Sequence, residues 1–272
     1  MSSLDAMPLV SLAMWTTLAL VSTTLFALGL GFAVERSVQK AGRKILDMPL
    51  RRRQLRHEAI GTALFHLVFV LPFVWALHTG AIHFSSGWLA NVLGFAVAWY
   101  AFIAFYYFFH RAMHHRALFW MHRWHHESVV TTPMSGLSMH PLEAVGWTAA
   151  MLAPAIVLSH FDRLGAGGWF FFLAVHWIGN IVGHANAELS PVRSTRLSTL
   201  TMSNPISYHS LHHARFEGHY GFVIATMDWL FGTEFPDWMA VHQRVFEGRP
   251  LTSARERIAV ATAETGPARR ER

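Results

Sequence analysis

The hydrophobic positions of the sequence fall into long stretches without charge, separated by segments that carry the polar residues. The first stretch, residues 8–34, runs for 27 positions without a charged side chain. It is longer than the core of a signal peptide and has no basic segment before it, so it predicts a tilted membrane-spanning helix. The stretches 59–77 and 88–109 have the same character and predict two more spans.

Two shorter apolar stretches follow, residues 141–159 and 167–183, and the segment HFDRLGAG joins them. Its glycines suit a tight reversal of the chain. At 19 and 17 residues, both stretches lie at the lower limit for crossing a bilayer. We therefore expect a short helical hairpin that either crosses the membrane or dips into it without crossing.

Composition and charge support a membrane protein. Hydrophobic residues make up 53% of the chain and charged residues only 14%, which argues against a soluble cytoplasmic enzyme. The connector 35–58 is rich in Lys and Arg, which marks a cytoplasmic loop. With this connector inside and the N-terminus outside, every Lys and Arg except Arg163 lies on the cytoplasmic side. Membrane topology thus accounts for the net charge of +6 better than a nucleic-acid-binding surface does.

Histidines recur at helical spacing in HRAMH (110–114), HRWHH (122–126) and HSLHH (209–213). Positions i, i+3 and i+4 share one helix face, so we expect each motif to form one patch of imidazoles. A single histidine on an apolar face is more often a core residue than a ligand, but three such motifs within 104 residues have no packing rationale. They predict a metal site on the cytoplasmic side.

The number and type of ligands indicate which metal is bound. The sequence contains no Cys, which excludes a disulfide framework, a thiolate zinc site and an iron–sulfur centre. Eight imidazoles exceed the coordination sphere of one ion, and an all-histidine pair of sites with open positions fits iron and oxygen chemistry. His184 returns to the same depth and adds a ninth candidate; the alternative for it is a helix-end histidine that binds a carbonyl.

The predicted fold is all-α: an integral membrane helical bundle of three long spans plus a short helical hairpin, with a cytoplasmic helical layer that holds the di-metal site. Residues 1–248 form one domain with its histidine-box core at about 95–235, and residues 249–272 form a polar, disordered tail. The helix of the third motif is expected to begin at Ser203-Asn204-Pro205, where a capping residue precedes a proline at the first helical position.

Residues 95 to 235 also carry a family resemblance. The three histidine motifs, MHPLE after the second and WLFGT after the third resemble the fatty acid hydroxylase and sterol desaturase superfamily of membrane di-iron enzymes. More closely, HRAMHH, VVTTPMSGLSMHPLE, GHANAEL and YHSLHH look like the histidine-box half of the plant wax-alkane aldehyde decarbonylases. His219-Tyr220 stands where much of the superfamily has Asn-Tyr.

The resemblance implies a set of metal ligands, which are His110, His114, His122, His125, His126, His184, His209, His212 and His213. His140 and His219 are expected to hold ligands in one tautomer, and Glu143 and Asn186 to accept imidazole N–H groups. Glu143 also begins a helix, where an acid is stabilised anyway. Glu188 and Asp228 are candidates either for a role at the site or for helix caps and ion pairs.

Other histidines have weaker signals. His66 and His176 lie within apolar stretches, where an ionisable group is costly and is either functional or held by structural hydrogen bonds. His115 is offset from the face of its motif. The remaining ones are expected at the surface or at interfaces between elements, and they are His57, His78, His83, His160 and His242.

Together these features predict a membrane-bound non-haem di-iron oxygenase that hydroxylates or desaturates a lipid, such as a fatty acyl chain or sterol-like molecule. It would use two iron ions, O2 and external electrons. A long-chain aldehyde deformylating or decarbonylating enzyme is the alternative. We expect the inner or plasma membrane in a bacterium and the endoplasmic reticulum in a eukaryote, with the site facing the cytoplasm.

Neither a nucleotide fingerprint nor an iron–sulfur motif occurs in the sequence, so electrons must come from a separate ferredoxin or small haem-b cytochrome with its reductase. We expect it to dock on the basic face formed by the arginines of 36–56 with Arg193, Arg196 and Arg215.

A non-catalytic protein is the competing class. A haem b carrier needs paired histidines at matching depth, for which only His66 and His176 qualify. A metal transporter would place its ligands along the spans.

Overall fold

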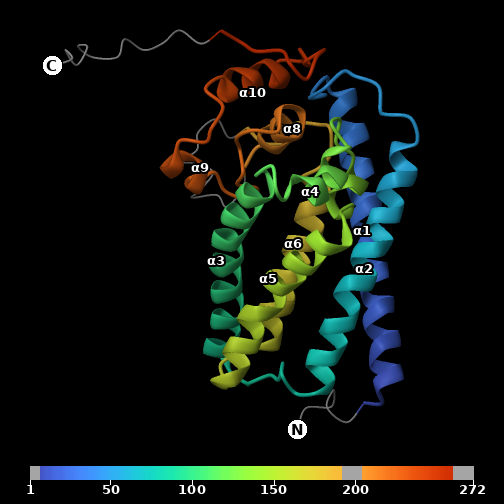
Figure 1. Cartoon of the computed structure of the whole chain (residues 1–272), viewed down its shortest axis with the longest axis vertical. Coiled ribbons are helices and arrows are strands. Elements are labelled where there is room, and N and C mark those ends of the chain that lie inside the picture. Colours follow the sequence, from blue (N-terminus) through green and yellow to red (C-terminus); the bar gives the residue numbers. More distant parts are fainter. Residues whose placement is uncertain (1–6, 192–203, 260–272) are drawn as a thin grey trace, which may run out of the picture.

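The computed structural model of the chain describes residues 7–191 and 204–259 (Figure 1). The expectations for Arg193, Arg196 and Ser203 lie outside these residues. The helices that are described are α1 (Leu9–Lys40), α2 (Gln54–His78), α3 (Trp88–Met113), α4 (Phe119–His126), the 3-10 helix η1 (Pro133–Leu137), α5 (Pro141–His160), α6 (Ala166–Val182), α8 (Ile206–Arg215), α9 (Thr226–Phe231) and α10 (Trp238–Phe246).

Helices α1, α2, α3 and α5 are long and apolar enough to cross a membrane, and α6 is a shorter apolar helix. The predicted all-α membrane bundle is therefore confirmed. Helix α1 continues six residues beyond the apolar stretch, to Lys40, because ERSVQK contains neither Gly nor Pro and favours a helix. The basic connector is correspondingly shorter than the pattern predicted.

The hairpin of α5 and α6 runs the length of the bundle (Figure 1). Its tip contacts the turn between α2 and α3, where Ser159 Oγ donates to the His83 carbonyl at 3.0 Å. On the other side of the tip, Gly165 N donates to the Ala90 carbonyl at 2.9 Å. The hairpin thus reaches the same end of the bundle as that turn.

Helices α3 and α6 cross closely because small residues line their contact. Gly168 packs on the backbone of Asn91, and its N–H donates to Asn91 Oδ1 at 3.0 Å. A Cβ on Gly94 would lie 2.8 Å from the Gly165 carbonyl oxygen. This crossing fixes α6, and with it His176 and His184, against the helix that carries the first histidine motif.

The outer surface of the bundle is apolar. Large hydrophobic side chains such as Leu25, Phe26, Leu67, Leu71 and Val157 are exposed. Only 17% of the most apolar window of α1 is buried inside the protein. An apolar surface of this extent needs lipid rather than water as its solvent, so this is a membrane protein.

The short helices α4, α8, α9 and α10 form a layer at the end of the bundle that also holds the α1–α2 connector (Figure 1). Leu251 is fully buried there, and its carbonyl accepts from Asp47 N at 2.8 Å. Leu251 therefore packs against the connector. Residues 260–272 of the predicted tail lie outside the described part of the chain.

Candidate metal centre

The nine histidines predicted as ligands lie together in this layer, in two groups within which the candidate ligand atoms are all less than 4.8 Å apart. All are buried except His114, which is half-buried. The first group is His110, His114, His122, His126 and His212, and the second is His125, His184, His209 and His213. That they bind metal stays a prediction, but the structure brings all of them to one place.

Each H-x-x-H-H motif is divided between the two groups, whereas the spacing predicted one patch for each motif. In α4, His122 and His126 belong to the first group and His125 to the second. In α8 the order is reversed, because His209 and His213 belong to the second group and His212 to the first. Neighbouring helix residues point about 100° apart, so the adjacent histidines of each motif face different centres.

Six of these imidazoles are held by an oxygen acceptor at Nδ1. A carbonyl or carboxylate oxygen can only accept, so Nδ1 carries the proton and Nε2 presents a lone pair. The pairs are His110 with Tyr220 O (2.7 Å), His122 with Glu143 Oε1 (2.9 Å), His125 with Ser138 O (3.1 Å), His184 with Asn180 O (2.6 Å), His212 with Gly218 O (2.7 Å) and His213 with Ser128 O (3.0 Å).

The Nε2 atoms converge. His126 Nε2 lies 3.1 Å from Nε2 of both His122 and His212. His209 Nε2 lies 3.0 Å from that of His184 and 3.1 Å from that of His213. His126 and His209 have no partner at Nδ1 among the described residues, so either a proton on their Nε2 or a cation between the rings can satisfy the lone pairs that point at them. The nitrogen-rich donor set and its orientation therefore fit transition-metal ions.

Burial favours the neutral form of the grouped histidines outside the spans. Burial first, and the neighbouring imidazoles second, hold the pKa of His126 and His209 well below the ordinary value. Burial lowers the pKa of His125 to about 4 and that of His184 to about 3. Neutral imidazole is the form that binds a metal, so these groups need not lose protons when an ion enters.

Of the side chains predicted to hold ligands in one tautomer, Glu143 does contact one. Its Oε1 accepts from His122 Nδ1 and, at 3.1 Å, from Trp147 Nε1. His140 instead caps α5, where its Nδ1 accepts from Leu142 N at 3.2 Å. Asn186 Oδ1 accepts from Leu46 N at 2.8 Å, which ties the connector to the segment after α6. No hydrogen bond joins His140 or Asn186 to a grouped imidazole within 7–191 and 204–259.

His219 acts on the site through Tyr208. Its Nδ1 donates to the Tyr208 carbonyl at 2.9 Å, and its ring stacks on the Tyr208 ring at 3.5 Å. The backbone at His219 is left-handed, with φ +54°. Asn and His both tolerate this conformation better than most residues, which explains a histidine at a position where the superfamily often has Asn. Since Tyr208 precedes His209, His219 fixes the start of the third motif.

The side chain that caps the start of helix α8 comes from a residue distant in sequence. Glu188 Oε2 accepts from Ser207 N at 2.8 Å, so Glu188 is a capping residue, one of the two roles left open for it. Asn204 is not the cap that was expected: Pro205 is the flanking residue rather than the first helical one. Asn204 instead donates through Nδ2 to the Phe222 carbonyl at 3.0 Å. The reason is that a buried carboxylate satisfies the amide groups at the start of this helix.

Asp228 also has a structural role. Its carboxylate accepts from Tyr220 N and Gly221 N, each at 2.7 Å, and so shapes the turn whose Tyr220 carbonyl holds His110. Burial raises the pKa of Asp228 to about 6.

Sequence reasoning missed the acceptors that orient the ligands. Five of the six are backbone carbonyls, and every residue type supplies a carbonyl, so the sequence carries no signal for them. Glu58 had a signal that was overlooked, since it is an acid at the start of an apolar stretch. It accepts from Ser128 Oγ at 2.7 Å and from Thr132 Oγ1 at 2.6 Å, and so steadies the segment whose Ser128 carbonyl holds His213.

Two of the remaining histidines settle expectations. His242 is fully buried in α10 beside Phe246, so of the two expected places, surface or interface, the structure leaves the interface. His66 has both nitrogens engaged, by Thr24 Oγ1 at 2.8 Å and by the Thr62 carbonyl at 2.7 Å. The pair that haem would need is therefore not free, and the grouped histidines lie at one end of the bundle rather than along the spans, as transport would require.

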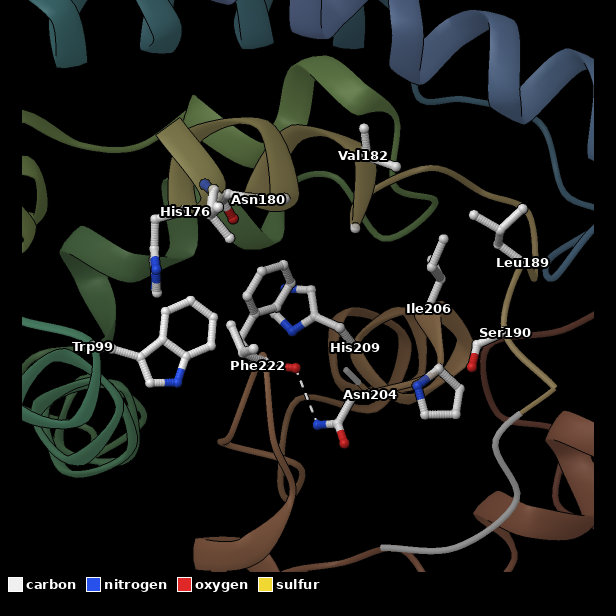
Figure 2. A pocket seen from close by; sticks show the side chains of 15 residues that line it. Trp99, His176, Asn180, Val182, Leu189, Ser190, Asn204, Ile206, His209 and Phe222 are labelled. Atoms are coloured by element: carbon white, nitrogen blue, oxygen red, sulfur yellow. Dashed lines mark hydrogen bonds between the residues drawn. The ribbon is translucent and has the colours of Figure 1, made fainter. Parts of the chain in front are cut away.

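An apolar cavity leads to the histidines. It has a volume of about 430 Å³ and is lined by Trp99, His176, His209 and Phe222, with Leu189 and Ile206 farther along (Figure 2). A smaller cavity of about 40 Å³ shares His176 and Phe222 and reaches His122, His125 and His184. The space beside both histidine groups thus continues into an apolar pocket.

The sequence model for fatty acid hydroxylases matches residues 95–233. All nine grouped histidines lie within this range. The chain belongs to the fatty acid hydroxylase family. It is 30% identical over 207 residues to Protein CER1-like 1 of Arabidopsis thaliana, an alignment that covers 71% of this chain and 32% of the relative.

Two other relatives of this fatty acid hydroxylase family member have an activity in their names. Very-long-chain aldehyde decarbonylase GL1-6 of Oryza sativa subsp. indica is 28% identical, covering 60% of this chain and 26% of its own. Very-long-chain aldehyde decarbonylase CER1 of Arabidopsis thaliana is 28% identical, with 52% and 23% covered. The chain thus spans about a third or less of these relatives. No solved structure matches it.

Proposed function

We propose that the protein is a membrane-bound non-haem di-iron oxygenase that hydroxylates a long-chain lipid, using O2 and electrons from a separate donor. The observation that carries this proposal is the pair of buried all-histidine groups beside an apolar cavity. A histidine-rich donor set favours iron over magnesium or calcium, and two groups suit two ions. When bound, the iron pair supplies the chemistry that activates O2 for attack on a C–H bond.

The protein's own residues hold the ligands and shape the space beside them. The oxygen acceptors at Nδ1 keep each Nε2 directed inward, and Glu143 is the acceptor behind His122. Phe222 packs on His184 and His209, with ring centroids 5.4 and 4.6 Å apart, and so keeps water from that side of the second group. The apolar cavity presents a hydrocarbon chain to the metal side of these ligands.

Deformylation or decarbonylation of a long-chain aldehyde is the second candidate. The names of two similar plant proteins favour it, although they share only part of their length with this chain. The same ligands would serve, because the two reactions differ in the group presented to the metal and not in the metal site.

The proposal also includes the orientation in the membrane and the electron donor. The exposed arginines Arg51, Arg52 and Arg53 lie on the connector and Arg56 in the first turn of α2, at the end of the bundle that holds the histidines. Arg51 lies 3.7 Å from Glu127, the residue after α4, so the basic surface adjoins the metal site. A cytoplasmic ferredoxin or small haem-b cytochrome with an acidic face would dock there.

The test is product analysis with purified, iron-loaded protein, a reduced donor, O2 labelled with oxygen-18 and a panel of long-chain lipids. Hydroxylation predicts a product that contains the label, and aldehyde decarbonylation predicts a hydrocarbon one carbon shorter. His122→Ala should abolish product. His115→Ala is the matched control, because His115 is exposed and belongs to neither group, and it should leave the rate unchanged. Equal rates in the two variants would refute the proposal.

A further inference from the structure

His176 differs in its hydrogen bonding from His66, the other histidine singled out within an apolar stretch. Its side chain is 5% exposed, yet neither ring nitrogen has a partner among the described residues. His66, by contrast, has a partner at each nitrogen. Burying a polar group without a partner is unfavourable, above all within a membrane. An unpaired imidazole held at this depth therefore points to a ligand that supplies the missing partner.

Aromatic rings hold the imidazole of His176 in place. Its ring centroid lies 4.0 Å from that of Phe102, 5.0 Å from that of Phe172 and 5.3 Å from that of Trp99. These contacts fix the ring between α3 and α6 while leaving both nitrogens unpaired. The side chain is thus oriented before any ligand binds, which reduces the entropy that binding costs.

His176 lies where the cavities meet. It lines the large cavity that extends to His209 (Figure 2). It also lines the small cavity that reaches His122, His125 and His184. A lipid chain that fills either cavity therefore lies beside this imidazole.

The lack of charged side chains in the described cavity lining limits which chemical groups the cavity can bind. The lining residues of the large cavity that the structure describes include no Lys, Arg, Asp or Glu. A carboxylate or phosphate would have no counter-ion among these described lining residues, and burying an unpaired charge is far more costly than burying a dipole. A neutral imidazole offers one donor and one acceptor, which matches an uncharged hydroxyl or carbonyl group.

We infer that His176 is the polar anchor of the substrate pocket and binds an uncharged hydroxyl or carbonyl oxygen of a long-chain lipid. This inference rests on the proposed function, whose substrate class it narrows. His176 lies six residues, or roughly 9 Å along the axis, before the end of α6 at Val182, and His184 follows that end. The anchored oxygen is therefore separate from the carbon that is oxidised at the metal centre.

The experiment compares the binding of hexadecanol and hexadecane to purified iron-loaded protein in detergent micelles, in the wild type and in His176→Phe. For each protein, the affinity for hexadecanol is divided by the affinity for hexadecane. Dividing the wild-type ratio by the variant ratio then cancels the partition of each lipid into micelles. One neutral hydrogen bond predicts that the affinity ratio of the wild type is about threefold to tenfold higher than that of His176→Phe. His176→Gln, which keeps a donor and an acceptor, should restore part of this preference for hexadecanol.

His66→Phe is the structural control. It removes the hydrogen bonds of His66 to Thr24 and to the Thr62 carbonyl and should lower the unfolding temperature, although Thr24 keeps its bond from Trp177. His176→Phe removes an unpaired group and should not lower it. An affinity ratio unchanged by His176→Phe, or a loss of unfolding temperature as large as that of His66→Phe, would overturn the inference. Iron content and turnover of the same preparations test the proposed function separately. A protein without iron that still shows the change in ratio would refute only the proposed function.

Discussion

Glu143 allows a sharp test of how the protein holds its metal ligands. Its carboxylate is 1% exposed and accepts the Nδ1–H of His122 at 2.9 Å, and it contacts no other grouped histidine within the described residues. Replacing the carboxylate should therefore weaken the first group, which contains His122, and leave the second group unchanged.

The expected loss of metal affinity follows from the strength of this hydrogen bond. A charge-assisted bond of about 1.5–3 kcal/mol is roughly twice as strong as a neutral one, so Glu143→Gln should cost about 1 kcal/mol, or about fivefold in metal affinity. Glu143→Leu removes the acceptor and should cost about 10- to 100-fold, the usual effect of losing the carboxylate partner of a ligating histidine.

The assay is iron titration against a competing chelator, which resolves a tighter and a weaker ion per chain. The Gln and Leu variants should weaken one ion in graded steps and leave the other at the wild-type affinity. Glu127→Gln is the matched control, because this acid follows α4 directly but its carboxylate is partly exposed and pairs with Arg51 and His57 rather than with a grouped histidine. A loss shared equally by both ions, or no loss in the Leu variant, would show that Glu143 does not hold His122.

Three further predictions concern topology, stability and electron supply. Reporter fusions after residues 56 and 84 should report opposite compartments, since one end of the bundle holds the connector and the other the α2–α3 turn; the same compartment for both would contradict the layout. Asp237→Asn should lower the free energy of unfolding by about 3 kcal/mol, because it breaks the buried pair in which Arg215 Nη1 lies 2.6 Å from Asp237 Oδ1. Burial raises the pKa of Asp237, but the hydrogen bonds from Arg215 outweigh this and leave it below the ordinary value. The stabilisation from the Arg215–Asp237 pair should therefore be complete above about pH 4 and be lost as pH falls through the lowered pKa of Asp237. Thermal unfolding of the wild type at a series of pH values should show this loss, and that of Asp237→Asn should not. Donor-dependent turnover should fall as added salt shortens the Debye length from about 10 Å at 0.1 M to about 3 Å at 1 M; a rate indifferent to salt, or full turnover without a donor, would refute docking on the arginines.

The bundle and eight of the nine grouped histidines could be predicted from the sequence because both follow from periodicity. His184 was predicted from its place at the end of an apolar stretch and from the family resemblance. Apolar length sets the spans, and helical spacing sets which imidazoles face each other. The division of each H-x-x-H-H motif between two groups could not be predicted, because it depends on how α4 and α8 are rotated about their axes against α3. Those rotations are set by packing among distant segments.

Residues that hydrogen-bond a candidate ligand, rather than bind the metal themselves, were harder to predict. Glu143 was found because an acid close in sequence to a ligand motif is a recognisable signal. His140 and Asn186 have the same signal but bind backbone groups instead, of Leu142 and Leu46. His176 was flagged by its position in an apolar stretch, but only the structure separates it from His66, since the difference lies in partners contributed by other helices.

The most direct test of the two-group centre is the iron content of protein purified from iron-replete cells, for the wild type and for one ligand variant from each group. The account predicts about two iron ions per chain in the wild type, since two histidine groups are present. His122→Ala and His213→Ala should each lower the content, both should abolish turnover, and the optical spectrum should show no haem band. Full iron occupancy and turnover in both variants, or an intense haem band in the wild type, would contradict it.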